Sequence, residues 1–418
     1  MKNVARALVA VAAVGTLCAA AACGGSSSNG NNNGSTPLPP TANTVTITAG
    51  PGPSTVNPAL NGAFVSVTIC VPGSASQCAT VPNVLLDTGS SGLRVLSSAL
   101  GNLPLANLTS GGATVASCIQ YVDLSYNWGP VAQADVKMAG EVSASTSLQI
   151  IADPSSTFPA APSSCANGGT RANTVDTLSA NGILGLSSYL YDCGSACAPG
   201  TTSNPGLYYS CSGTACQVTT VPLANQIQNL VARFASDNNG FSVTLPALPD
   251  AGLPTTTGTL TFGIGTQSDN ALGSAVVQTQ DLYGSFTTVF NGVSYPSSFI
   301  DSGSNAVFFL DSATTGLPGC TVSVGFYCPS TTQVLSATNT GTNNLSKSVN
   351  FTVANLDRLP ARNSVFDDVA GSSSFGDSQG GPPSLYFDWG LPFFFGRTVF
   401  VAIEGRSTPG GTGAYWAY

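Results

Sequence analysis

The chain has 418 residues, of which only 7% are charged, with 47 glycines, 27 prolines and a net charge of −8. It contains no histidine, which excludes Ser-His-Asp and Cys-His catalytic sites and histidine-ligated zinc. It also lacks the basic surface that nucleic-acid binding requires. Because strong helix formers are scarce while Gly, Pro, Ser and Thr abound, we expect an all-β fold with a few short helices.

Residues 1–23 have the pattern of an export signal. Two basic residues precede an apolar run, and small residues lead to Cys23. This pattern is typical of a bacterial lipobox, so we expect Cys23 to be acylated and the protein to be an outer-membrane-anchored lipoprotein of the cell envelope; plain secretion is the alternative. Residues 24–54, rich in Gly, Ser, Asn and Pro, are expected to form a flexible linker.

The ten cysteines after the signal favour five disulfides, because the number is even and the chain is predicted to be exported. Two pairs are close enough in sequence for each disulfide to link the two strands of one β-hairpin, namely Cys70 with Cys78 and Cys320 with Cys328. A longer link could join Cys118 to Cys165. Three pairings are open for the remaining four, Cys193, Cys197, Cys211 and Cys216. A metal knuckle is less favoured because no Cys-x-x-Cys spacing occurs.

Several segments have a clear periodicity. Alternating apolar residues predict strands at 61–69, 131–138 and 148–152. Residues 222–235 have apolar side chains at helical spacing and end before a turn-like segment, which predicts a helix.

Two apolar strands each lead into an aspartate within a turn of small residues. The first segment is Val84-Leu85-Leu86-Asp87-Thr88-Gly89-Ser90, and the second is Ser298-Phe299-Ile300-Asp301-Ser302-Gly303-Ser304. Taken singly, each aspartate could be an ordinary turn former. Held together, two such carboxyls would share one proton and could deprotonate water while protonating a carbonyl oxygen. A glycosidase also uses two carboxylates, but it rarely builds them from two such turns.

These motifs resemble those of pepsin-type aspartic peptidases. In that family each lobe carries a second motif, two apolar residues and a glycine, beside the Asp turn. Ile183-Leu184-Gly185 and Phe394-Phe395-Gly396 follow their aspartates at similar distances along the chain. The resemblance implies a bilobal double barrel with pseudo-twofold symmetry, an N-terminal lobe at 55–245 and a C-terminal lobe at 246–418. The chain also resembles an uncharacterised domain family of bacterial lipoproteins.

The resemblance also implies roles for individual residues. Asp87 and Asp301 would be catalytic, Gly185 and Gly396 would lie in the psi-shaped crossings, and Tyr121 would be the flap tyrosine. The Asp turns would be supported by Thr88, Gly89, Ser90, Ser302, Gly303 and Ser304. The implied protein is a monomeric endopeptidase acting on peptides or unfolded proteins without metal or cofactor, and it would contact a membrane only through its lipid.

Three residues depart from the family pattern. Val122 and Leu124 replace the two flap glycines, and Arg94 stands where the family usually has tryptophan. The alternative function is therefore a catalytically weak or inactive pepsin-fold surface lipoprotein that binds peptides or proteins.

Overall fold

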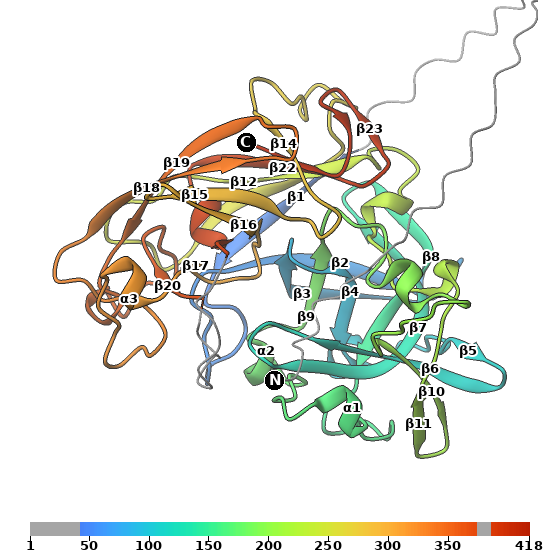
Figure 1. The fold of residues 1–418 in the computed structure, drawn as a ribbon. Helices are drawn as coiled ribbons and strands as arrows, with labels where there is room; N and C mark the ends of the chain where they lie inside the picture. The colour runs from blue at the N-terminus through green and yellow to red at the C-terminus, as the bar shows by residue number, and fades with distance from the viewer. Residues whose placement is uncertain (1–41, 374–385) are drawn as a thin grey trace, which may run out of the picture.

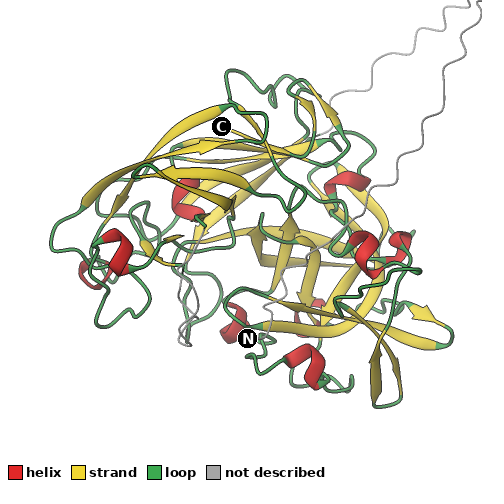
Figure 2. Cartoon of the chain, viewed as in Figure 1, coloured by secondary structure: helices red, strands yellow, loops and turns green. Residues whose placement is uncertain are grey.

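The computed structural model describes residues 42–373 and 386–418 (Figure 1). Strands dominate it, and its α-helices are single turns (Figure 2). These helices are α1 Ser163–Ala166, α2 Val175–Leu178 and α3 Ser312–Thr315. The predicted all-β class is confirmed. In the described ranges, no helix has the length and apolar character needed to cross a membrane.

The largest sheet has 16 strands and runs through both halves of the chain. Its N-terminal strands are β1 Thr44–Gly50, β2 Gly62–Cys70, β3 Cys78–Asp87, β4 Ser91–Leu96, β5 Thr109–Ser110, β6 Ala113–Gln120, β7 Tyr126–Met138, β8 Glu141–Ile151, β9 Gly182–Leu186, β10 Tyr208–Ser212 and β11 Ala215–Val218. Its later strands are β12 Gly240–Leu245, β13 Thr256–Phe262, β14 Val277–Thr279, β22 Arg397–Ala402 and β25 Tyr415–Ala417. The strands predicted at 61–69, 131–138 and 148–152 correspond to β2, β7 and β8.

A second sheet of seven strands belongs to the C-terminal half. Its strands are β15 Phe286–Phe290, β16 Val293–Ile300, β17 Val307–Phe309, β18 Gln333–Thr340, β19 Ser346–Val353, β20 Ala370–Ser372 and β21 Asp388–Trp389. A small hairpin is formed by β23 Ser407–Thr408 and β24 Gly411–Thr412. Figure 1 shows β2, β3, β4 and β9 on one side of the molecule and β15 to β20 on the other.

The strands between the two halves include part of the predicted linker. Strand β1 pairs with both β2 and β13, so the expectation of a flexible linker over 24–54 is wrong for residues 44–50. Alternation explains the pairing, because Ile47 is fully buried whereas Thr46 and Thr48 are exposed. The export signal, Cys23 and the linker before residue 42 lie outside the described residues and stay predictions, as do the lobe boundaries.

The helix predicted over 222–235 is not formed. Two separate 3₁₀ turns, Leu223–Asn225 and Val231–Arg233, occupy its ends. Side-chain amides between them bind the main chain of other segments: Gln226 donates to Gly194 O and Val221 O, and Asn229 donates to Ser187 O. These bonds compete with helical hydrogen bonds. The larger apolar side chains from Ile227 to Phe234 are still buried, whereas Leu223 is 39% exposed. The apolar spacing therefore marked side chains that face the core and not a helix.

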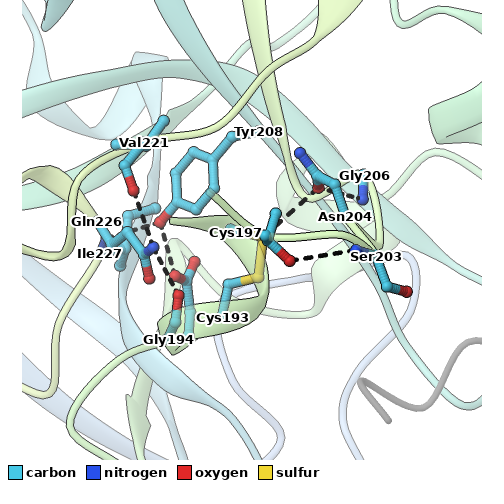
Figure 3. The surroundings of a disulfide bond; sticks show 12 residues. Cys193, Gly194, Cys197, Ser203, Asn204, Gly206, Tyr208, Val221, Gln226 and Ile227 are labelled. Carbon is cyan, nitrogen blue, oxygen red and sulfur yellow. Dashed lines mark hydrogen bonds between the residues drawn. A yellow bond between two sulfur atoms is a disulfide. The ribbon is translucent and has the colours of Figure 1, made fainter. Parts of the chain in front are cut away.

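Five disulfides are present, as predicted. They join Cys70 to Cys78, Cys118 to Cys165, Cys193 to Cys197, Cys211 to Cys216, and Cys320 to Cys328. The structure therefore selects one of the three pairings that the sequence left open. Figure 3 shows the Cys193–Cys197 bond beside the buried ring of Tyr208.

Candidate active site

The two aspartates end equivalent strands in the two halves. Asp87 is the last residue of β3, and Asp301 follows the last residue of β16. Strand β3 runs parallel to β9, which pairs antiparallel with β4. Strand β16 likewise runs parallel to β21, which pairs antiparallel with β17. Each half therefore presents one carboxyl from the same three-strand arrangement.

The glycine beside each Asp turn is Gly185 in the first half and Gly390 in the second. Gly185 lies opposite Asp87 in register, and a Cβ there would come within 2.8 Å of the Ser90 main chain. A Cβ on Gly390 would come within 2.1 Å of Ala306 O. Only glycine permits these close approaches.

Gly396 was expected at the second crossing, and that expectation is wrong. Its missing Cβ would face Ala247 at 3.5 Å, outside the Asp turn. The register pairs Ile300 with Trp389, which places the next residue, Gly390, beside Asp301. The second motif is therefore Asp388-Trp389-Gly390, whose first residue is not apolar.

Reciprocal hydrogen bonds tie the two Asp turns together. Thr88 N donates to Ser302 Oγ at 3.1 Å, and Ser302 N donates to Thr88 Oγ1 at 2.9 Å. The same hydroxyls donate to main-chain carbonyls of the opposite half, Thr88 to Ile300 O and Ser302 to Leu86 O. This network is buried and fixes the spacing of the turns.

Each turn also holds its own carboxylate. Gly89 N donates to Asp87 Oδ1 at 2.8 Å, and Gly303 N donates to Asp301 Oδ1 at 2.7 Å. The other oxygens are contacted by hydroxyls, with Ser90 Oγ 2.5 Å from Asp87 Oδ2 and Ser304 Oγ 3.0 Å from Asp301 Oδ2. The residues that sequence placed in the two turns are thus brought together around two carboxyls.

The two carboxyls face each other across the turns. A Cβ on Gly89 would lie 2.6 Å from the Asp301 carboxyl carbon, and one on Gly303 would lie 2.9 Å from that of Asp87. Loss of hydration raises the pKa of Asp301 well above its ordinary value, and the adjacent charges of Asp87 and Asp388 raise it further. The pair therefore retains a proton on Asp301 under conditions in which an exposed aspartate is ionised.

A third carboxyl, Asp388, lies in the same cluster and was not expected from the sequence. Its Oδ2 lies 2.6 Å from Ser304 Oγ, which also contacts Asp301. One hydroxyl has one proton to donate, so the shared contact favours a proton on one of the two carboxyls. Burial raises the pKa of Asp388 to about 8, and the charge of Asp87 also raises it. The only sequence signal is an acidic residue within an otherwise apolar segment, two positions before Gly390.

Tyr121 is the first residue of the loop that connects β6 to β7 at the tip of their hairpin. Its hydroxyl donates to Asn127 Oδ1 at 2.6 Å, and Asn127 in turn donates to Ala172 O. Asp123 accepts from Ser125 N, and Leu124 adopts a positive φ of 67°. The hairpin tip thus closes without the glycines usual in pepsin-type flaps.

Arg94 is fully buried and forms an ion pair with Asp192 at 3.0 Å. Tyr208 donates to the other oxygen of Asp192 at 2.6 Å. Burial raises the pKa of Asp192 to about 6, against the lowering influence of Arg94 and Tyr208. Arg94 therefore forms part of the interior of the first half and is not a solvated surface residue.

Among the described residues, one group has possible ligand atoms close enough together to hold a metal ion, namely Cys320, Cys328 and Asp357. Both sulfurs are consumed in a disulfide, and Asp357 accepts hydrogen bonds from main-chain amides, including that of Ser323. This donor set does not fit a metal ion.

Comparisons with known proteins agree with this architecture. The family described as "Protein of unknown function (DUF3443)" matches residues 39–418. The aspartic proteinase from Irpex lacteus has a similar structure, with a TM-score of 0.51 and 16% sequence identity over 90% of this chain and 96% of that chain. At this identity the likeness establishes the bilobal pepsin-like fold alone. No curated protein sequence matches.

Proposed function

The chain belongs to the DUF3443 family, and we propose that it is an aspartic endopeptidase that hydrolyses extended peptides. The observation that carries this proposal is the dyad itself: Asp87 and Asp301 face each other, each held by a main-chain amide and a serine hydroxyl. The pepsin-like fold supports the same function by analogy.

The reaction requires one proton on the pair. With that proton on Asp301, the Asp87 carboxylate removes a proton from a bound water, whose oxygen attacks the peptide carbonyl carbon. Asp301 protonates the carbonyl oxygen, which gives a tetrahedral diol. Collapse of the diol transfers the proton from Asp87 to the leaving nitrogen and returns a hydroxyl proton to Asp301. One water is consumed, and both carboxyls regain their starting states.

The proposed setting is outside the cytoplasm. Five disulfides favour an oxidising compartment. Together with the predicted signal and Cys23 lipobox, they support an enzyme tethered at the cell envelope, and we propose that it acts as a monomer. Its substrates would then be peptides or unfolded segments that reach this compartment.

The test is cleavage of a mixed peptide library by the purified protein from pH 3 to pH 7. We expect cleavage at acidic pH that declines towards neutral pH, and loss of at least 1000-fold in both Asp87→Asn and Asp301→Asn, roughly the size of losses known for catalytic residues that act as a unit. Asp250→Asn, which changes an exposed aspartate, is the matched control and should retain activity.

The departures at Val122, Leu124 and Arg94 favour a second candidate, a pepsin-fold lipoprotein that binds peptides without turning them over. Both flap residues are exposed, at 67% and 47%, and so offer an apolar contact surface at the hairpin tip. A folded, disulfide-intact protein that binds a statine-type peptide but cleaves no library member would refute the peptidase proposal and support this one.

A further inference from the structure

Three neighbouring side chains line one face of the second sheet beside the dyad. Asp388 is in register with Phe299 on β16 and with Phe308 on β17. Residues paired in register project to the same face of a sheet. The next residues along, Ile300 and Trp389, are buried in the core, so the row of Phe299, Asp388 and Phe308 faces the opposite way, towards the side of Ser304.

The carboxyl in this row has one oxygen without a partner. Asp388 Oδ2 contacts Ser304, but within the described part of the chain Oδ1 makes no hydrogen bond. Asp388 is only 7% exposed and its Oδ1 atom is buried, so solvent satisfies little of the hydrogen-bonding capacity of this oxygen. A buried acceptor in this state is costly unless a donor approaches it.

The two phenylalanines beside it are half-buried. Phe299 stacks on Tyr386 with ring centroids 5.6 Å apart, and Phe308 packs against Phe326 at 5.7 Å. The carboxyl of Asp388 is therefore bordered on both sides by aromatic side chains. This combination suits a cation on an apolar stem.

The first half of the molecule lacks this feature. The positions equivalent to Phe299, Asp388 and Phe308 are Leu85, Ile183 and Arg94. No carboxyl stands there, and the guanidinium turns to Asp192. The first half therefore holds its aspartate without a carboxyl at this position, and Asp388 is a feature of the second half.

We propose that Phe299, Asp388 and Phe308 form a subsite that selects a lysine or arginine side chain flanking the scissile bond. The proposal rests on the proposed peptidase function and names its substrate class. In the free protein Asp388 Oδ1 is covered, so the flanking rings must move apart when the substrate binds. The ammonium or guanidinium group then pairs with the Asp388 carboxyl, while its methylene stem lies against the rings. Because Asp388 shares Ser304 with Asp301, a side chain bound there belongs to a residue next to the bond being cleaved.

Binding of a cationic side chain beside Asp388 should release a proton from its carboxyl, and this release can be measured. The groups that face Asp388 are Ser304, Asp301 and, through its charge, Asp87; among them is no cation. Burial raises the pKa of Asp388 to about 8, so the free protein holds a proton there at pH 6. A bound cation stabilises the carboxylate and displaces that proton.

The test uses two non-cleavable statine peptides that differ only by lysine or norleucine at a residue flanking the statine, each flanking position being tried in turn. Titration calorimetry at pH 6 should show at least tenfold tighter binding of one lysine peptide, which is about 1.4 kcal/mol. The same titration in two buffers of different ionisation enthalpy should show release of about one more proton with lysine than with norleucine.

Asp388→Asn should abolish both the preference and the extra proton, while Asp250→Asn should keep them. Equal binding of the two peptides at both positions, or a preference that survives in Asp388→Asn, would overturn the subsite. These outcomes are separate from catalysis, because binding of either peptide without library cleavage would refute only the peptidase function. Failure of both peptides to bind would overturn both proposals.

Discussion

Replacing Asp388 with asparagine should stabilise the protein, and the gain should depend on pH. The pKa of Asp388 is raised from 3.8 to about 8 by burial. The native state therefore holds a proton that the unfolded chain releases above pH 3.8. A group with a raised native pKa favours the folded state fully below its unfolded pKa, and that contribution is lost as the pH rises towards the native pKa.

The size of the gain follows from the same shift. At pH 7 the pH lies about 3 units above the pKa of the Asp388 carboxyl in the unfolded chain. Each unit is worth about 1.36 kcal/mol, so keeping this carboxyl protonated costs the native state at most about 4 kcal/mol. The asparagine side chain has nearly the same shape as aspartate and no proton to release on unfolding. Asp388→Asn should therefore raise the free energy of unfolding by about 2–4 kcal/mol at pH 7 and by little at pH 4.

Guanidinium denaturation of the disulfide-intact wild type and variant at both pH values measures this difference. Asp250→Asn provides the control, since that side chain is exposed and its replacement should shift both curves by under about 0.5 kcal/mol. An equal change at pH 4 and pH 7, or destabilisation at pH 7, would show that Asp388 is ionised in the native state and would refute the reasoning.

Two further substitutions test the frame around the dyad. Gly89→Ala places a methyl group 2.6 Å from the Asp301 carboxyl carbon, so library cleavage at pH 4 should fall by about 100-fold; Gly319→Ala, whose Cβ would meet nothing closer than 3.9 Å, should not change it, and equal activity in both would contradict the facing geometry. Arg94→Met leaves Asp192 buried without its cation, so denaturation at pH 7 should show a loss of about 3–5 kcal/mol. That loss should shrink at pH 4, where Asp192 is protonated; a pH-independent loss would indicate a packing effect instead.

The two Asp turns could be predicted from sequence because their chemistry is local. A short run of Asp, Ser or Thr, and Gly supplies the carboxyl, the supporting hydroxyl and the close main-chain approach within a single turn. Thr88 and Ser302 exchange bonds across the two halves, yet each is recognisable from its own turn. The same locality explains why the disulfides at Cys70–Cys78 and Cys320–Cys328 were predictable.

The second crossing could not be placed from sequence because it depends on register between distant strands. Phe394-Phe395-Gly396 has the expected residue types, whereas Asp388-Trp389-Gly390 does not. Pairing of β16 with β21 decides between them, since it brings Gly390 beside Asp301. A carboxyl in that motif conflicts with the apolar pattern of a buried strand, and this conflict is the reason that sequence reasoning passed over Asp388.

Both halves keep the features that the dyad requires of the main chain, and they differ where side chains flank it. Gly185 and Gly390 meet the same steric demand, and Gly89 and Gly303 approach the opposite carboxyl alike. At the flanking position, however, the first half has Ile183 and the second has Asp388. Burying a third carboxyl with an unsatisfied oxygen lowers the stability of the protein, and it is not needed to position Asp87 and Asp301. That cost is understandable if the oxygen binds a donor that arrives with the substrate, and the lysine and norleucine peptides test this directly.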